Sequence, residues 1–149
     1  MFKILIVEDE DSIRTIINKY LSKYDIGCIE TENGVKGLEV FTKNKDNIDL
    51  VIMDVMMPEM DGVECTKKIR EISNVPIIML TAKNQDEDEI EGLKVGANDF
   101  ITKPFNLEVL LLRIKKLINL DSSNDLELVS EQRSVRKNGR FIELTKKEY

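Results

Sequence analysis

The sequence predicts an α/β protein with a doubly wound, five-stranded parallel sheet and helices on both faces. Short runs of apolar, mostly β-branched residues alternate about five times with stretches that carry apolar residues at helical spacing. Within each run there is no polar alternation, which is typical of strands buried on both faces. Strands and helices that alternate in this way favour a parallel sheet with right-handed crossovers.

The first 120 residues contain all of these elements in strict order. We expect Asp11 or Ser12 to cap the first helix. The expected strands are 4–7, 26–30, 50–53, 77–80 and 100–101. The expected helices carry apolar residues at Ile13, Ile16, Ile17, Tyr20, Leu21 and Tyr24, then at Val35, Leu38 and Phe41, at Val63, Thr66, Ile69 and Ile72, at Ile90 and Leu93, and at Leu107, Leu110, Leu111, Ile114, Leu117 and Ile118.

The pattern changes in the polar stretch 121–125, which we interpret as a linker between a domain at 1–120 and a segment at 126–149. Residues 126–129 and 141–144 are expected to be short antiparallel strands, and Asn138-Gly139 is a hairpin-turn signal. A few strands cannot bury a core by themselves. We therefore expect the start of a second domain; a hairpin packed on the first domain is the alternative.

Composition excludes several classes of function. The 149 residues include 28 acidic and 22 basic side chains, a net charge of −6, which argues against a basic nucleic-acid platform. There is no His, so a His-based triad, a His zinc site and a phosphohistidine carrier are excluded. Cys28 and Cys65 lack metal-like spacing and are expected to fill apolar space. Few cysteines and no signal peptide predict a cytoplasmic protein, and no apolar run approaches the roughly 20 residues of a membrane span.

Polar residues suited to chemistry follow the ends of the expected strands. Glu8 and Asp9 follow the first strand, Asp54 ends the third, Thr81 ends the fourth and Lys103 follows the fifth. The carboxyl ends of parallel strands share one edge of a sheet, where ligands bind. We therefore expect these five side chains to meet in one cleft.

Acids gathered at one edge favour a divalent cation and phosphoryl chemistry. Two like charges about 4 Å apart repel by about 4 kcal/mol at a surface-like dielectric, and Mg²⁺ relieves this while binding phosphate oxygens. A carboxylate beside Mg²⁺ can form an aspartyl phosphate, with a hydroxyl and an ammonium stabilising the transferred group. No phosphate-binding glycine loop is present, so the donor is expected to be another protein or a small phosphate. A solvated helix N-terminus would explain Glu10 and Asp11 only.

At these residues the sequence resembles the receiver domains of two-component response regulators. The resemblance covers roughly residues 1–120 and implies the flavodoxin-like strand order 2-1-3-4-5. The matching motifs are ILIVEDE at 4–10, MDVMMPEMDG at 53–62, LTA at 80–82 and GANDFITKPF at 96–105.

The resemblance implies a role for each acid of the cleft. Asp54 is similar to the phospho-acceptor of the family. Asp9, Asp54 and the backbone carbonyl of Met56 would bind Mg²⁺, and Glu8 would assist, through water.

The resemblance also implies the roles of the residues around the acceptor. Thr81 and Lys103 would contact the phosphoryl group. Phe100 stands where the family has its aromatic switch residue; a core position in the strand is the alternative. A cis peptide bond is expected between Lys103 and Pro104.

The function that this resemblance implies is a switch in which a sensor histidine kinase phosphorylates Asp54. The chain would then be a signalling protein rather than an enzyme, with self-dephosphorylation expected. The tail resembles the start of an OmpR/PhoB-type winged-helix domain, so promoter DNA would be a partner of the full-length protein only. Two alternatives are a phosphatase resembling the haloacid-dehalogenase superfamily, with Asp9 as nucleophile, and a receiver-like module that does not accept phosphate.

Active receivers of this subfamily pair through the fourth helix, fifth strand and fifth helix with salt bridges across the dimer. Asp99 and Arg113 keep one such pair. The other two pairings are replaced, so we expect weak or unusual self-association. The replacements are Glu89 with Val109, and Lys94 with Lys115.

Overall fold

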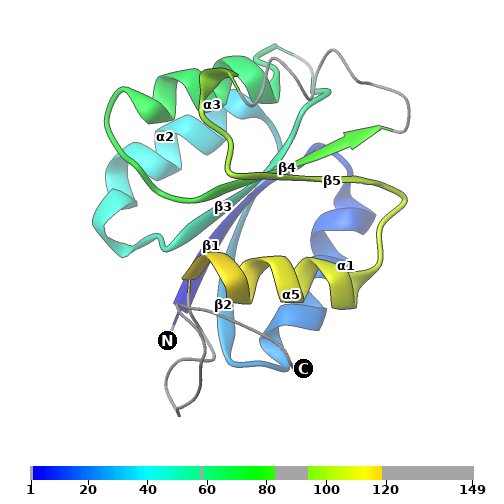
Figure 1. The fold of residues 1–149 in the computed structure, drawn as a ribbon. Helices are drawn as coiled ribbons and strands as arrows, with labels where there is room; N and C mark the ends of the chain where they lie inside the picture. The colour runs from blue at the N-terminus through cyan, green and yellow to red at the C-terminus, as the bar shows by residue number, and fades with distance from the viewer. Residues whose placement is uncertain (1, 58, 83–93, 119–149) are drawn as a thin grey trace. The chain divides into compact units, whose positions relative to one another are not determined.

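The computed structural model describes residues 2–57, 59–82 and 94–118, and they form a five-stranded sheet with flanking helices (Figure 1). All strand pairs are parallel and the order is β2-β1-β3-β4-β5. Both the sheet and its order are as predicted; the antiparallel segment expected at 126–149 lies outside the described residues. The strands are β1 (Phe2–Val7), β2 (Ile26–Thr31), β3 (Leu50–Asp54), β4 (Ile77–Ala82) and β5 (Asp99–Lys103).

The helices cover both faces of the sheet. Figure 1 shows α2 and α3 on one face, and α1 and the beginning of α5 on the other. The chain divides into two units, Met1–Arg113 and Ile114–Tyr149, and the sheet belongs to the first. The helix expected around Ile90 and Leu93 lies outside the described residues. The described helices are α1 (Asp11–Ser22), α2 (Gly34–Asn44), the short 3₁₀ helix η1 (Lys45–Asn47), α3 (Gly62–Arg70) and α5 (Leu107–Ile118).

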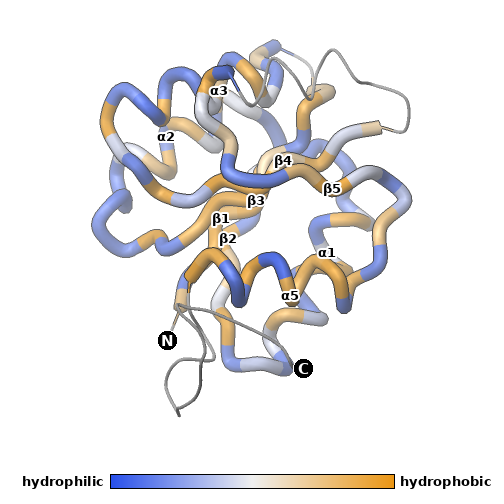
Figure 2. The backbone as a smooth tube through the Cα atoms, in the orientation of Figure 1, coloured by the Kyte–Doolittle hydropathy of each residue, from blue (hydrophilic) through white to orange (hydrophobic). Residues whose placement is uncertain are grey.

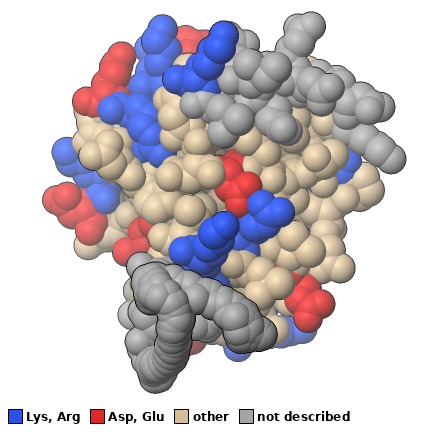
Figure 3. Space-filling model, viewed as in Figure 1, with Lys and Arg blue, Asp and Glu red and all other residues tan. Residues whose placement is uncertain are grey.

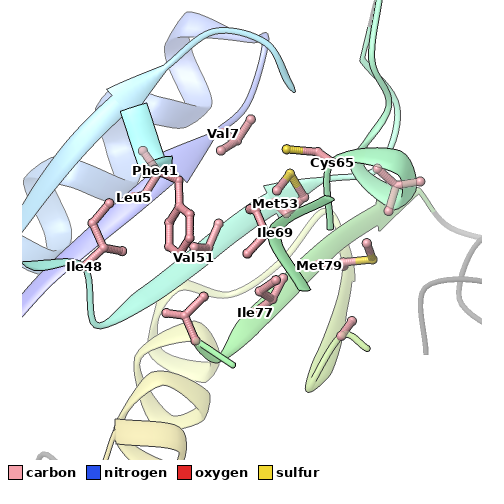
Figure 4. Close-up of a cluster of buried hydrophobic side chains, with 13 residues drawn as sticks. Leu5, Val7, Phe41, Ile48, Val51, Met53, Cys65, Ile69, Ile77 and Met79 are labelled. Atoms are coloured by element: carbon pink, nitrogen blue, oxygen red, sulfur yellow. The ribbon is translucent and has the colours of Figure 1, made fainter. Parts of the chain in front are cut away.

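The core is built by strands whose two faces are both apolar. On the face toward α2 and α3, side chains from β1, β3 and β4 pack with Phe41, Cys65 and Ile69 (Figure 4). Ile4 and Ile6, which alternate with these strand residues, are fully buried as well. In Figure 2 the strands β3 and β4 are mostly apolar, whereas the helices alternate between polar and apolar residues. This burial explains why the strand runs show no polar alternation.

The sequence predicts that both cysteines fill apolar space, and the structure shows this for Cys65. Cys65 is buried in the cluster between α3 and the sheet, and Cys28 in β2 is half-buried. Burial raises the pKa of each thiol to about 12, with nearby acids adding to the effect. Neither thiol is a reactive group at neutral pH.

The start of α1 differs from the prediction. Glu10 is the N-cap residue and makes no side-chain capping bond, so neither Asp11 nor Ser12 is the cap. Asp11 is already the first helical residue, and its carboxylate forms an ion pair with Arg14. The buried stripe of the helix is also narrower than its spacing suggests, because Ile16 is 52% exposed.

The end of α3 comes earlier than expected. The helix ends at Arg70, and Ile72, which the spacing assigns to its apolar face, is 41% exposed beyond it. The amides of Glu71 and Ile72 donate to the carbonyls three residues before them. This 3₁₀-type tightening turns the chain out of the helical path before Ile72 can reach the core.

No helix in the described ranges has both the length and the apolar character that a membrane span requires.

Replacing Phe41 with Ala tests the importance of this core. Phe41 is fully buried in α2, so the substitution leaves a cavity and should lower the free energy of unfolding by about 3–5 kcal/mol. Val35→Ala in the same helix is the matched control, because Val35 is 45% exposed and should change stability by no more than about 0.5 kcal/mol. Urea denaturation followed by circular dichroism measures both. Similar losses for the two variants would contradict the assignment of the core.

Candidate functional site

The register of the parallel strands brings the chemically useful side chains to one edge of the sheet. Val7 pairs with Met53, so the residues that follow β1 lie beside Asp54 at the end of β3. Thr81 pairs with Thr102, and Ala82 pairs with Lys103. The residues after β1 and at the ends of β3, β4 and β5 therefore share the edge that the sequence predicts.

Lys103 connects two buried carboxylates at this edge. Its Nζ atom lies 3.1 Å from Oδ1 of Asp54 and donates a hydrogen bond to it. The same Nζ lies 2.9 Å from Oε1 of Glu8. The Glu8 side chain is fully buried and the Asp54 side chain is 4% exposed, whereas Lys103 is 24% exposed. One ammonium thus serves two carboxylates, one at the end of β3 and one directly after the neighbouring strand β1.

The backbone around Glu8 is held on both sides. Its amide donates to the carbonyl of Thr31 at 3.1 Å, and its Oε2 accepts from the amide of Glu10 at 3.0 Å. The other oxygen, Oε1, is buried and close to Lys103 but makes no well-directed hydrogen bond. Buried polar atoms are normally hydrogen-bonded, so this oxygen has capacity for a further partner.

The environment of Asp54 works against its ionised form. Burial raises the pKa of the Asp54 carboxyl, the charge of Glu8 raises it further, and Lys103 offsets only part of this, so the pKa is about 7. For Lys103, partial burial alone would lower the pKa, but the contact with Glu8 and the charge of Asp54 outweigh it and raise the pKa overall. Lys103 therefore stays protonated at neutral pH.

The acids also satisfy the geometric requirement for a cation site. Glu8, Asp9 and Asp54 each offer a carboxylate oxygen, and these oxygens lie within 4.8 Å of one another. Asp9 is exposed to solvent, while Glu8 and Asp54 are buried. All three residues offer oxygen ligands, and Oε1 of Glu8 is buried without a well-directed hydrogen bond. Such a set of oxygen atoms suits a hard cation such as Mg²⁺.

The remaining predicted residues surround this edge. Thr81 is buried at the end of β4, and its hydroxyl donates a long hydrogen bond of 3.4 Å to the carbonyl of Ala82. Phe100 in β5 is half-buried and packs against the cluster under α2 and α3. Met56, in the loop after β3, has a side chain that is 59% exposed. The Lys103–Pro104 peptide bond is cis, as expected.

The start of α3 is pressed against the backbone of Asp54. The amide of Gly62 donates to the carbonyl of Val55 at 2.9 Å, and a Cβ atom on Gly62 would lie 2.2 Å from the carbonyl oxygen of Asp54. Asp61 caps the helix by accepting from the amide of Glu64 at 2.8 Å. The loop that leaves Asp54 is therefore closed tightly by the helix that follows it.

Asp99 and Arg113 form an ion pair inside the chain. One guanidinium nitrogen of Arg113 lies 2.8 Å and 2.7 Å from the two carboxylate oxygens of Asp99. Acidic and basic side chains meet over β5 and α5 on the face drawn in Figure 3. The pair that the resemblance assigns to a dimer contact is thus satisfied within one copy.

Sequence reasoning missed the direct pairing of Glu8 with Lys103, because it gave Glu8 only an assisting role through water. Glu8 continues the row of Ile4 and Ile6 along the strand, and both are fully buried. Asp9 continues the row of Leu5 and Val7, which is buried just as fully, and Asp9 is nevertheless exposed. Alternation along the strand therefore does not tell from the sequence which of the two acids is buried.

Residues 4–115 match the family model of the response regulator receiver domain, and the chain belongs to that family. It is therefore the receiver of a two-component response regulator, a signalling switch rather than a classical enzyme. Receivers of this family bind Mg²⁺ at an acidic pocket and interact with histidine kinases or phosphotransfer proteins.

Individual proteins of known name are similar to this chain. Transcriptional regulatory protein SrrA of Staphylococcus aureus is 40% identical over 125 residues, which make up 84% of this chain and 51% of SrrA. This chain therefore spans about half the length of the curated relatives it matches. The solved receiver domain of the Francisella response regulator 1452 has a TM-score of 0.74 and 32% identity, with 80% of this chain and 98% of that chain covered.

A further similar structure shows a receiver with a partner. A chain in the co-crystal of the Saccharomyces cerevisiae histidine phosphotransfer protein Ypd1 with the receiver domain of Ssk1 has a TM-score of 0.73 and 29% identity. The match covers 80% of this chain and 90% of that chain.

The raised pKa of Asp54 predicts how stability changes with pH when no metal is bound. Folded Asp54 keeps its proton up to about pH 7, whereas the unfolded carboxyl loses it near pH 4. The folded state therefore binds more protons between these values, and the contribution of Asp54 to stability falls as pH rises through this window and levels off above it. Asp54→Asn should remove this fall. The free energy of unfolding of the variant, relative to that of the wild type, should therefore increase by roughly a few kcal/mol as the pH rises from 4 to 8.

Urea denaturation in the presence of a chelator, at intervals from pH 4.5 to pH 8, measures this difference. Asp46→Asn, at an exposed position in η1, is the control and should track the wild type. A constant difference between Asp54→Asn and the wild type across the whole range would show that Asp54 titrates normally.

Proposed function

We propose that Asp54 accepts a phosphoryl group from a sensor histidine kinase in a Mg²⁺-dependent reaction, and that this switches a DNA-binding output domain. The observation that carries the proposal is the buried Asp54 carboxylate 3.1 Å from Lys103, with Glu8 and Asp9 within reach of the same cation. A buried acid, a paired amine and two further acids at the ends of parallel strands match the needs of aspartyl phosphate chemistry.

The transfer requires ionised Asp54 to attack phosphorus. Lys103 favours the ionised form, against the effects of burial and of Glu8. An oxygen of Asp54 then bonds to phosphorus while the bond from phosphorus to the kinase's imidazole nitrogen breaks. Lys103 is close enough to donate to an oxygen of the transferred group, and Thr81, at the end of the adjacent strand, supplies a hydroxyl for another. Attack of water on the same phosphorus would return Asp54 to its free form.

The acids would hold the cation that this chemistry uses. Asp9, Asp54 and the backbone carbonyl of Met56 would bind Mg²⁺, with Glu8 assisting. When bound, Mg²⁺ supplies positive charge that offsets the repulsion of the carboxylates and the charge of the phosphoryl group.

In this proposal, phosphorylation of Asp54 changes the structure at strand β5. Phosphorylation adds about −1.5 to −2 charge in a site that already holds Glu8 and Asp9. A move of Thr81 toward the phosphoryl group would vacate space beside β5, where Phe100 is half-buried and able to turn inward. The face of β5 and α5 would then differ between the two states, with a coupling free energy of about 1–3 kcal/mol.

The output domain is proposed from the relatives and the tail. SrrA, of which this chain matches about half, is named a transcriptional regulatory protein. We propose a receiver at 1–120, a linker at 121–125 and, at 126–149, the start of an OmpR/PhoB-type winged-helix domain that binds promoter DNA in the full-length, cytoplasmic protein. None of the tail lies within the described residues.

Labelling with acetyl phosphate tests which carboxylate accepts phosphorus. Asp54→Asn should abolish Mg²⁺-dependent incorporation, and Asp9→Asn should reduce it strongly but leave the acceptor in place. Asp46→Asn, on the surface away from the edge, should leave labelling unchanged. Intact-mass spectrometry measures the added phosphoryl group. Labelling that survives in Asp54→Asn and is lost in Asp9→Asn would support the phosphatase alternative, in which Asp9 is the nucleophile.

Self-association is proposed to be weak or unusual. Arg113 is already paired with Asp99 in the same copy, so a second copy gains little from this pair unless it displaces the internal contact. On α5, Val109 is 40% exposed and Leu112 is 60% exposed, which leaves apolar contact as the main attraction.

Sedimentation velocity with the phosphate mimic beryllofluoride tests this proposal. The activated protein should remain mostly monomeric at low micromolar concentration, and Leu112→Ala should weaken any residual association more than Asp99→Asn does. A tight dimer, with a dissociation constant in the nanomolar range, would contradict it.

A further inference from the structure

Arg14 binds the backbone at the acidic edge without facing the acceptor. It lies in the first turn of α1, and its side chain is only 12% exposed. Its Nη1 atom donates to the backbone carbonyl of Glu8 at 2.5 Å. Its Nη2 atom forms an ion pair with the carboxylate of Asp11, and its Nε atom lies 3.4 Å from a carboxylate oxygen of Glu30. The end of β1, the start of α1 and β2 are thus joined through a single side chain.

The hydrogen bond from Arg14 to the carbonyl of Glu8 also restrains Asp9, the next residue. The carbonyl of Glu8 belongs to the planar peptide unit that leads into Asp9, so holding this oxygen restricts the direction in which Asp9 leaves the strand. On the far side of Asp9, the amide of Glu10, which belongs to the peptide unit that leaves Asp9, donates to Oε2 of Glu8 at 3.0 Å. Asp9, itself exposed, is therefore carried between two fixed peptide units.

Repulsion among the carboxylates is the force that this arrangement must resist. Glu8, Asp9 and Asp54 bring their oxygens within 4.8 Å of one another, and Lys103 forms ion pairs with Glu8 and Asp54. Without restraint, the Asp9 side chain would lower the repulsion by turning away from Glu8 and Asp54. A guanidinium suits the task of restraint, because it is always charged and offers several donors in one rigid plane.

We propose that Arg14 is a positioning residue that holds the Glu8–Asp9 turn in its cation-binding conformation and so sets the affinity for Mg²⁺. The proposal rests on the function proposed above and adds to it a residue that touches neither the cation nor the phosphoryl group. Losing such a supporting contact weakens metal affinity by about 10- to 100-fold in other proteins.

The test compares Arg14→Ala and Arg14→Lys with the wild type by calorimetric titration of Mg²⁺ alone and by the rate of acetyl phosphate labelling at increasing Mg²⁺. Both variants should bind Mg²⁺ about tenfold more weakly or worse. The labelling rate at saturating Mg²⁺ should stay within about twofold of the wild type, because the groups that meet the phosphoryl group are unchanged. Lys36→Ala is the matched control: Lys36, on α2, forms an exposed ion pair with Glu32, and its loss should change neither quantity.

Glu30→Gln provides a milder second variant in case Arg14→Ala folds poorly. It removes one anchor of the guanidinium and leaves the donor to Glu8 in place, so the Mg²⁺ affinity should fall by less than in Arg14→Ala. Unfolding in a chelator reports the purely structural contribution of each side chain.

Unchanged Mg²⁺ affinity in Arg14→Ala, with stability alone reduced, would overturn the proposal. Full recovery of affinity in Arg14→Lys would overturn it too, since a lysine restores the charge but not the planar set of donors. In both cases wild-type labelling on Asp54 would leave the proposed function standing. Absence of Mg²⁺-dependent labelling in the wild type would instead reject the proposed function itself.

Discussion

The sharing of one lysine between two buried carboxylates is the interaction on which the rest of the site depends. Asp54 ends β3 and Glu8 directly follows β1, and their carboxylates would repel each other at the edge of the sheet if Lys103 did not lie between them. Lys103 can reach them only because β5 runs parallel to β4 at the edge of the sheet and ends at the same level. The strand order, the register and the burial of these acids therefore form one arrangement: a different order would leave a charge without its partner.

Much of this arrangement could be predicted from residue positions alone. Asp54, Thr81 and Lys103 each end a short apolar run, and the ends of parallel strands meet by geometry, so their common edge needs no knowledge of side-chain packing. Finer features depended on competition between contacts. Asp11 looks like a helix cap, yet Arg14 engages its carboxylate and the cap position belongs to Glu10.

The same limit applies to burial and to pairing partners. Spacing assigns Ile16 to an apolar stripe, but in α1 only Ile17 and Leu21 are fully buried. Periodicity tells which residues share a face of the helix, but it does not tell how much of that face other elements cover. Asp99 and Arg113 have the right charges for a contact between copies, and the structure shows that α5 carries Arg113 back onto the start of β5 instead. Charge alone does not say which copy supplies the partner.

The close approach of Gly62 to Asp54 has a consequence for how this protein can vary. The helix α3 starts where a single added carbon would overlap the main-chain oxygen of Asp54. Any codon change at this position that introduces a side chain must displace either Asp54 or the start of the helix. The role proposed for Asp54 thus limits which residues position 62 accepts, although Gly62 has no functional group of its own. A screen of random variants should lose function there as sharply as at the charged residues.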